Sequence, residues 1–80
     1  MEIAMTNQTP TIGSIWKHHK RGTEYKVVDI TICCTNGSHE GQLTVIYEQL
    51  SPGEPGSKYQ KGTRMDRLSA EFMDGRFLAV

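Results

Sequence analysis

One stretch, Gly13 to Ile32, most constrains what this chain of 80 residues can fold into. It reads GSIWKHHKRGTEYKVVDITI and predicts a first strand over 13–20 and a second over 24–33. The turn between them, Arg21-Gly22-Thr23, contains a glycine that is free to adopt the positive φ of a tight hairpin. The sequence therefore predicts a β-ribbon that the rest of the chain covers.

The apolar positions of the second strand do not keep one parity. Tyr25 and Val27 alternate, and the pattern then passes to Val28, Ile30 and Ile32. Because side chains alternate between the two faces of a strand, such a change indicates a β-bulge or a sharp bend. Bends of this kind are how small barrels close.

The remaining strands and the one helical turn are expected to be short. Gly75 suits the left-handed position that ends a helical turn, Ser69 fits an N-cap, and Phe77 is expected to point inward. The expected order is a polar turn over 35–41, a third strand over 42–50, a long mobile loop over 51–62, a fourth strand over 63–68, a helical turn over 70–73 and a last strand over 76–80.

These elements predict a mainly all-β domain with one short helical turn before the last strand. A small SH3-like five-stranded barrel is the first interpretation, and a strongly bent, open antiparallel sheet is the alternative. Residues 1–11 are polar and aperiodic, so we expect a flexible tail followed by one domain over 12–80. A chain this short buries only roughly 60% of its unfolded surface, so it would gain stability from a partner.

Composition limits the function classes. Hydrophobic residues make up 36% of the chain and charged residues 22%, which suits a globular rather than a disordered chain. The formal net charge is zero, which argues against a grip on nucleic acid dominated by phosphate contacts. No apolar run reaches the length of a membrane span, and the first residues lack the pattern of a signal peptide, so a cytoplasmic location is the default expectation.

Four blocks of the chain, spread over 13–79, resemble a family of small uncharacterised bacterial and phage proteins. The family pattern runs roughly Y-x-H-x-K-G-x-x-Y-x-V, then V-x-Y, then W-x-R-P-x-x-x-F, then R-F. The matching residues are Trp16, His18, Lys20 or Arg21, Gly22, Tyr25, Val27, Val45, Tyr47, Met65, Arg67, Leu68, Phe72, Arg76 and Phe77. Met65 replaces the family's Trp and Leu68 its Pro. The resemblance implies an SH3-like barrel and a phage or prophage setting, and it implies no particular activity.

The candidate partner-binding surface is the cleft between the turn at Arg21 and the loop over 51–62. The candidate ligand- or partner-binding residues are Trp16, His18, Lys20, Arg21, Tyr59, Lys61 and Arg64. Basic residues here suit phosphate contacts, and aromatic residues suit stacking on a base. The competing interpretation is that the charges are ordinary solvated ones and that Trp16, Tyr25 and Tyr47 form the core. Tyr59 differs, because a polar loop gives an aromatic side chain less reason to be buried.

Arg67, Phe72 and Arg76 are expected to anchor the structure. Asp66, Glu71 and Asp74 lie near the two arginines in the sequence and are candidate partners for Arg67.

Metal binding and catalysis have little support in the sequence. Cys33 and Cys34 are adjacent and are expected to be reduced thiols, because side chains of neighbouring strand residues diverge. They and the histidines lack the spacing of a zinc site, and no catalytic motif is present. We therefore expect no cofactor, no metal and no enzymatic activity.

Three functions follow as hypotheses. The first is a non-enzymatic binding module of a phage or prophage that acts on a host protein. The second is a nucleic-acid-binding module, and the third is a sponge that sequesters a nucleotide signal of host defence. A symmetric homodimer through the last strand is expected separately, because that strand is short, apolar and at an edge.

Overall fold

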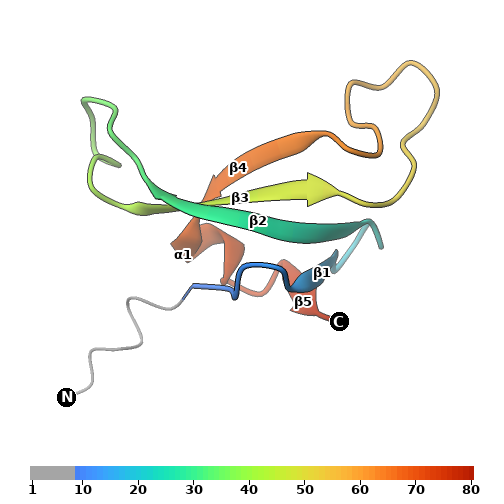
Figure 1. Cartoon of the computed structure of the whole chain (residues 1–80), viewed down its shortest axis with the longest axis horizontal. Helices are drawn as coiled ribbons and strands as arrows, with labels where there is room; N and C mark the ends of the chain where they lie inside the picture. Colours follow the sequence, from blue (N-terminus) through green and yellow to red (C-terminus); the bar gives the residue numbers. More distant parts are fainter. Residues whose placement is uncertain (1–8) are drawn as a thin grey trace.

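The computed structural model describes residues 9–80, and five strands and one helical turn follow along this range (Figure 1). They are β1 (Ile15–His18), β2 (Glu24–Ile32), β3 (Leu43–Gln49), β4 (Arg64–Leu68), α1 (Ser69–Phe72) and β5 (Phe77–Ala79). Most of the predicted tail over 1–11 lies outside the described residues. Of its last residues, Pro10 is buried, and Thr11 accepts a hydrogen bond from the Ser14 backbone N–H at 3.0 Å.

The five strands form one antiparallel sheet in the order β4-β3-β2-β1-β5. This confirms the predicted small all-β fold with one helical turn before the last strand. The sheet takes the open form, because β4 and β5 lie at opposite edges and do not pair with each other. The closed barrel was therefore the wrong one of the two predicted architectures.

The predicted irregularity in β2 is a β-bulge. Val27 pairs with Tyr47, but the next registered pair is Asp29 with Ile46, so Val28 is the extra residue. The bulge lets both halves of β2 place apolar side chains on the inner face: Val27 is fully buried, and Ile30 packs against the core.

The core lies on one face of the sheet, where α1 closes it from below in Figure 1. Phe72 comes from α1, and Phe77 from β5; their rings stack with centroids 4.4 Å apart. Trp16 meets Phe72 edge-on at 5.4 Å. The buried apolar residues are Tyr25, Val27, Val45, Tyr47, Phe72 and Phe77. Such edge-to-face and offset ring contacts stabilise a core beyond the area that they bury.

Several element boundaries differ from the predictions. β1 ends at His18, because the chain turns there and the Gly22 N–H donates to the His18 carbonyl at 2.9 Å. β5 begins at Phe77 rather than Arg76. The predicted N-cap at Ser69 is wrong: the β3–β4 ladder continues to Leu68, so Leu68 occupies the cap position and Ser69 is the first helical residue, buried beneath the sheet. Gly75 has a φ of +109°, which agrees with its predicted role in ending the turn.

Candidate functional site

A groove of about 950 Å³ lies between the β1–β2 turn and the loop over 51–62. Both connections leave the same end of the sheet, whereas the loop between β2 and β3 lies at the other end (Figure 1). The core side chains Tyr25, Tyr47 and Phe77 also line this groove. Its polar and charged lining includes His18, Arg21, Gln49, Glu54, Arg64, Asp66 and Arg67.

The loop over 51–62 is folded on itself and held by a buried glutamine. Gln49 is only 3% exposed, and its side-chain amide donates to the carbonyl of Ser51 at 2.9 Å and of Tyr59 at 3.1 Å. The backbone of Gln49 also donates to Thr63 and accepts from Gly62. One side chain thus ties both ends of the loop to β3. The long loop predicted from the sequence is a hydrogen-bonded Ω-loop.

Gly53 sits at the closest approach within this loop. A Cβ atom built there would lie 1.9 Å from the carbonyl oxygen of Tyr59, so only glycine fits. Gln60 completes the loop, since its side-chain amide donates to the carbonyls of Glu54 at 2.6 Å and Ser57 at 2.8 Å. These contacts fix the backbone that carries Tyr59.

Tyr59 projects from that fixed backbone into solvent at the groove. Tyr59 is 52% exposed, and its backbone N–H donates a hydrogen bond to the Ser57 hydroxyl at 3.0 Å. An exposed aromatic ring on a rigid support loses little conformational entropy when a partner covers it. Tyr59 therefore has the properties of a preformed contact residue.

His18 forms part of the opposite wall, at the end of β1. Its Nδ1 accepts the backbone N–H groups of Lys20 and Arg21, both at 3.2 Å, so the neutral ring carries its proton on Nε2. Burial, followed by the positive charges of Arg21, Arg67 and Arg76, lowers the pKa of His18. His18 is therefore neutral at physiological pH and holds the turn in shape.

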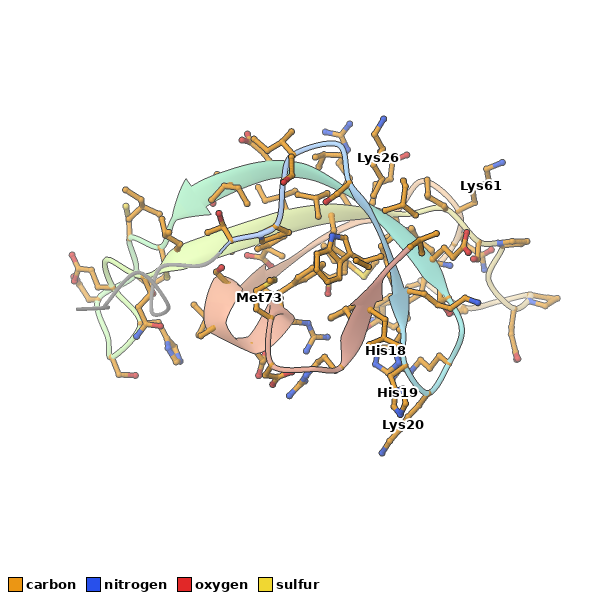
Figure 2. All side chains as sticks on the ribbon, turned by 90° about the horizontal axis from the view of Figure 1, so that it is seen from below. His18, His19, Lys20, Lys26, Lys61 and Met73 are labelled. Atoms are coloured by element: carbon orange, nitrogen blue, oxygen red, sulfur yellow. The ribbon has the colours of Figure 1, made fainter. Side chains whose placement is uncertain are left out.

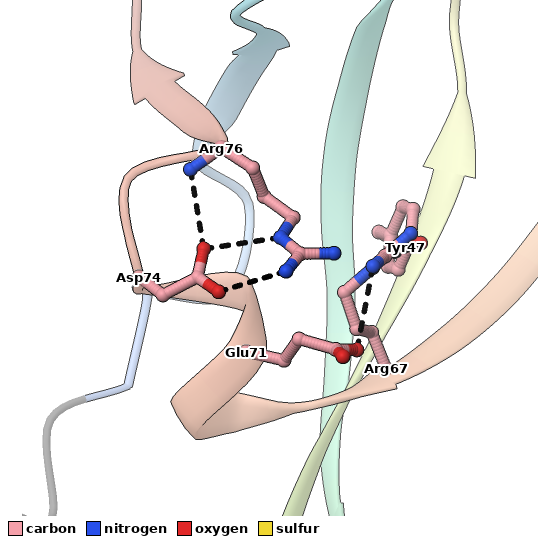
Figure 3. A network of polar contacts seen from close by, with 5 residues as sticks. All are labelled: Tyr47, Arg67, Glu71, Asp74 and Arg76. Carbon is pink, nitrogen blue, oxygen red and sulfur yellow. Dashed lines mark hydrogen bonds and ion pairs between the residues drawn. The ribbon is translucent and has the colours of Figure 1, made fainter.

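Arg67 lies in the groove wall and contacts the core (Figure 3). Its Nε donates to the Tyr47 hydroxyl at 3.2 Å, its Nη1 pairs with Glu71 at 3.3 Å, and its guanidinium lies 5.4 Å from the ring centroid of Phe77. Of the three predicted carboxylate partners, only Glu71 contacts it.

Asp74 pairs instead with Arg76, at 2.9 Å between Oδ2 and Nη2 (Figure 3). Hydrogen bonding to Arg76 lowers the pKa of Asp74, and the same bond raises the pKa of Arg76. Arg76 thus closes the turn that links α1 to β5 and does not line the groove.

The structure separates the predicted binding residues into two groups. His18, Arg21, Tyr59 and Arg64 line the groove. Trp16 packs into the core, where its ring N–H donates to the Ser14 hydroxyl at 2.8 Å. Lys20 lines a second hollow of about 410 Å³ with His18, His19, Asp74 and Arg76, and Lys61 lines neither. Trp16, Lys20 and Lys61 therefore do not line the groove, and Trp16 has the core position that the competing interpretation gave it.

Basic side chains outside the groove lie on more than one side of the molecule. Figure 2 shows Lys26 and Lys61 on one side of the molecule and His19 and Lys20 on the opposite side. A nucleic-acid duplex or strand needs a continuous basic track. This arrangement does not favour the nucleic-acid hypothesis.

The two cysteines are free thiols at the far end of β2. The Cys33 sulfur lies 3.3 Å from the Thr35 hydroxyl, and this hydrogen bond lowers the pKa of Cys33. Within residues 9–80 no three His, Cys, Asp or Glu side chains are placed together as a metal site would need.

Sequence reasoning missed Gln49 and Gly53, which shape the groove without being obvious binding residues.

Comparison with known proteins adds no assignment: no family model, no curated protein and no solved structure matches the chain. No helix in the described part of the chain is long and apolar enough to cross a membrane.

Proposed function

We propose that this protein is a non-enzymatic binding module whose groove takes an exposed segment of a partner protein. The observation that carries the proposal is the fixed loop over 51–62: a buried Gln49 and a sterically required Gly53 hold Tyr59 in an exposed position. Opposite it, the Arg21 side chain makes no hydrogen bond or ion pair to residues 9–80 and is available to a ligand.

The setting rests on the resemblance to small bacterial and phage proteins. On that basis the partner is a protein of the host cell, and the module acts in the host cytoplasm. A groove that is polar, open and flanked by one aromatic and one cationic anchor suits a peptide segment, because tyrosine and arginine contribute more than most residues to interface affinity.

The test is affinity capture from host lysate with micromolar bait. The wild-type protein and a Lys26→Ala control, altered on the outer face of β2, should retain the same specific protein. The variants Arg21→Ala and Tyr59→Ala should each lose it, with unchanged denaturation midpoints. Retention of nothing specific, or retention that survives both groove substitutions, would contradict the proposal.

A nucleotide is the second candidate ligand. The groove volume falls within the range of small-molecule sites, roughly 300–1,000 Å³, and Tyr59, Arg21 and Arg64 provide a ring and cations. Thermal-shift measurements with linear and cyclic nucleotides test this candidate. Stabilisation of the wild-type protein that disappears in Tyr59→Ala would support it, and no stabilisation by any nucleotide would dismiss it.

A further inference from the structure

The outer edge of β4 carries unpaired backbone groups. Gln49 donates its N–H to the Thr63 carbonyl, so odd-numbered residues of this segment face β3. Because orientation alternates along an antiparallel strand, the N–H and C=O groups of Arg64 and Asp66 point away from the sheet. No hydrogen bond from any other residue of 9–80 reaches these groups. β4 therefore presents a ready template for a further strand.

The charges on this edge alternate in a self-complementary way. Across the outer face, Lys26 is registered with Glu48, and Glu48 with Arg64, whose Nε lies 3.3 Å from the Glu48 carboxylate. This row of alternating charge ends at the edge with a cation. Two residues along, Asp66 is exposed, and its carboxylate makes no hydrogen bond or ion pair within residues 9–80.

We propose that a second copy of this chain adds to β4 as an antiparallel strand about a two-fold axis at Met65. In this register Arg64 lies opposite the partner subunit's Asp66, and symmetry repeats the pair, so that two opposite-charge pairs form on the outer face. The row of charges then continues across the interface: Lys26, Glu48, Arg64 and the partner subunit's Asp66. The same register makes Arg64 and the partner subunit's Asp66 a hydrogen-bonded backbone pair.

The edge at β5, which the sequence suggested as the dimer contact, is less suited. β5 has three residues, Phe77–Ala79, and none of them is charged. It therefore lacks the charge complementarity that fixes a register. Pairing at β4 also joins the two grooves, because Arg64, Met65, Asp66 and Arg67 all line the groove on one side. The dimer would present two grooves next to each other, an arrangement that a bivalent partner binds more tightly.

Charge exchange tests the pairing. Light scattering coupled to size exclusion should give twice the 9.0 kDa chain mass for the wild-type protein. Arg64→Asp or Asp66→Arg alone places like charges opposite each other twice, and we expect each to raise the dimer Kd by about tenfold or more. The double exchange, R64D with D66R, should restore the dimer. Circular dichroism and denaturation confirm that each variant folds. Lys20→Asp serves as the control charge change, because Lys20 is exposed in the turn between β1 and β2, and β4 lies at the other edge of the sheet from β1 and β5.

Cross-linking tests the register independently. Met65 would face its own copy in a non-hydrogen-bonded pair, with Cα atoms about 4.5 Å apart, within reach of a disulfide. In a background with Cys33→Ser and Cys34→Ser, Met65→Cys should form a covalent dimer under mild oxidation, and Leu78→Cys at the β5 edge should not. Cross-linking through Leu78 only would overturn the proposal in favour of β5. A monomer mass with neither cross-link would also overturn it, and Arg64 and Asp66 would then be charges that protect the edge from pairing.

Discussion

Arg67 is the side chain whose loss should cost this domain most outside its apolar core. Replacement by Ala removes the donor that satisfies the Tyr47 hydroxyl, and Tyr47 is only 3% exposed. An unsatisfied buried polar group costs about 1–3 kcal/mol. The contact with Phe77 adds about 0.5–1 kcal/mol. The pair with Glu71 adds only about 0.3–0.5 kcal/mol, because the Glu71 side chain is 48% exposed.

The expected destabilisation is therefore roughly 2–4 kcal/mol, a large share of the stability of a small domain. Urea denaturation at a fixed protein concentration measures it. Arg21→Ala is the matched control: the residue is exposed and its side chain makes no hydrogen bond or ion pair within residues 9–80, so its loss should cost under about 0.5 kcal/mol. Tyr47→Phe in the Arg67→Ala background should recover part of the loss, because it removes the orphaned hydroxyl. An unchanged midpoint for Arg67→Ala would refute this reasoning and leave Arg67 as a groove residue only.

Two further predictions concern the walls of the groove. Gly53→Ala should force the loop over 51–62 to refold, at about 1–3 kcal/mol, and abolish partner capture, whereas Gly37→Ala, where a Cβ meets open space, should change neither. The folded state lowers the pKa of His18 below the value of 6.5 that the residue has in the unfolded chain. The unfolded chain therefore binds a proton at a higher pH than the folded protein does, so stability should fall as the pH drops through and below 6.5. Denaturation midpoints at about pH 7.5 and about pH 5.5 should therefore differ less in His18→Asn than in the wild type or in His39→Asn, and equal pH dependence in all three would contradict the role of His18.

The sheet was predictable from the sequence because its strands obey local rules. Alternation put Val45 and Tyr47 on one face of their strand, and the parity change between Val27 and Val28 indicated an irregularity, which the structure shows as a bulge at Val28. Closure was not predictable, because it depends on whether β4 and β5 pair across the whole domain. Nothing in the local pattern of either strand specifies its neighbour. The Ser69 cap failed for a related reason: the long-range ladder through Leu68 took precedence over a local preference.

The position of the groove was predictable from the sequence, but the residues that shape it were not. The turn at Arg21 and the loop over 51–62 were assigned correctly as its two walls. Gln49 continues the inward parity of Leu43, Val45 and Tyr47, so its burial had a signal in the sequence, but a polar residue at a strand end is usually exposed. The steric requirement for glycine at position 53 was not predictable from the sequence. The loop contains three glycines, and only the folded chain brings Gly53 against the carbonyl of Tyr59.

The groove and the core share side chains, and this sharing links binding to stability. Tyr25, Tyr47 and Phe77 are buried core residues whose remaining surface forms the groove, and Arg67 connects two of them to Glu71. A partner seated there would cover the part of the core that the open sheet leaves uncovered. A partner present at a free concentration of about 100 times its Kd stabilises the folded state by about 2.7 kcal/mol. This gain is comparable to the loss expected for Arg67→Ala. A domain of this size therefore has physical reason to leave one side of its core available to a partner.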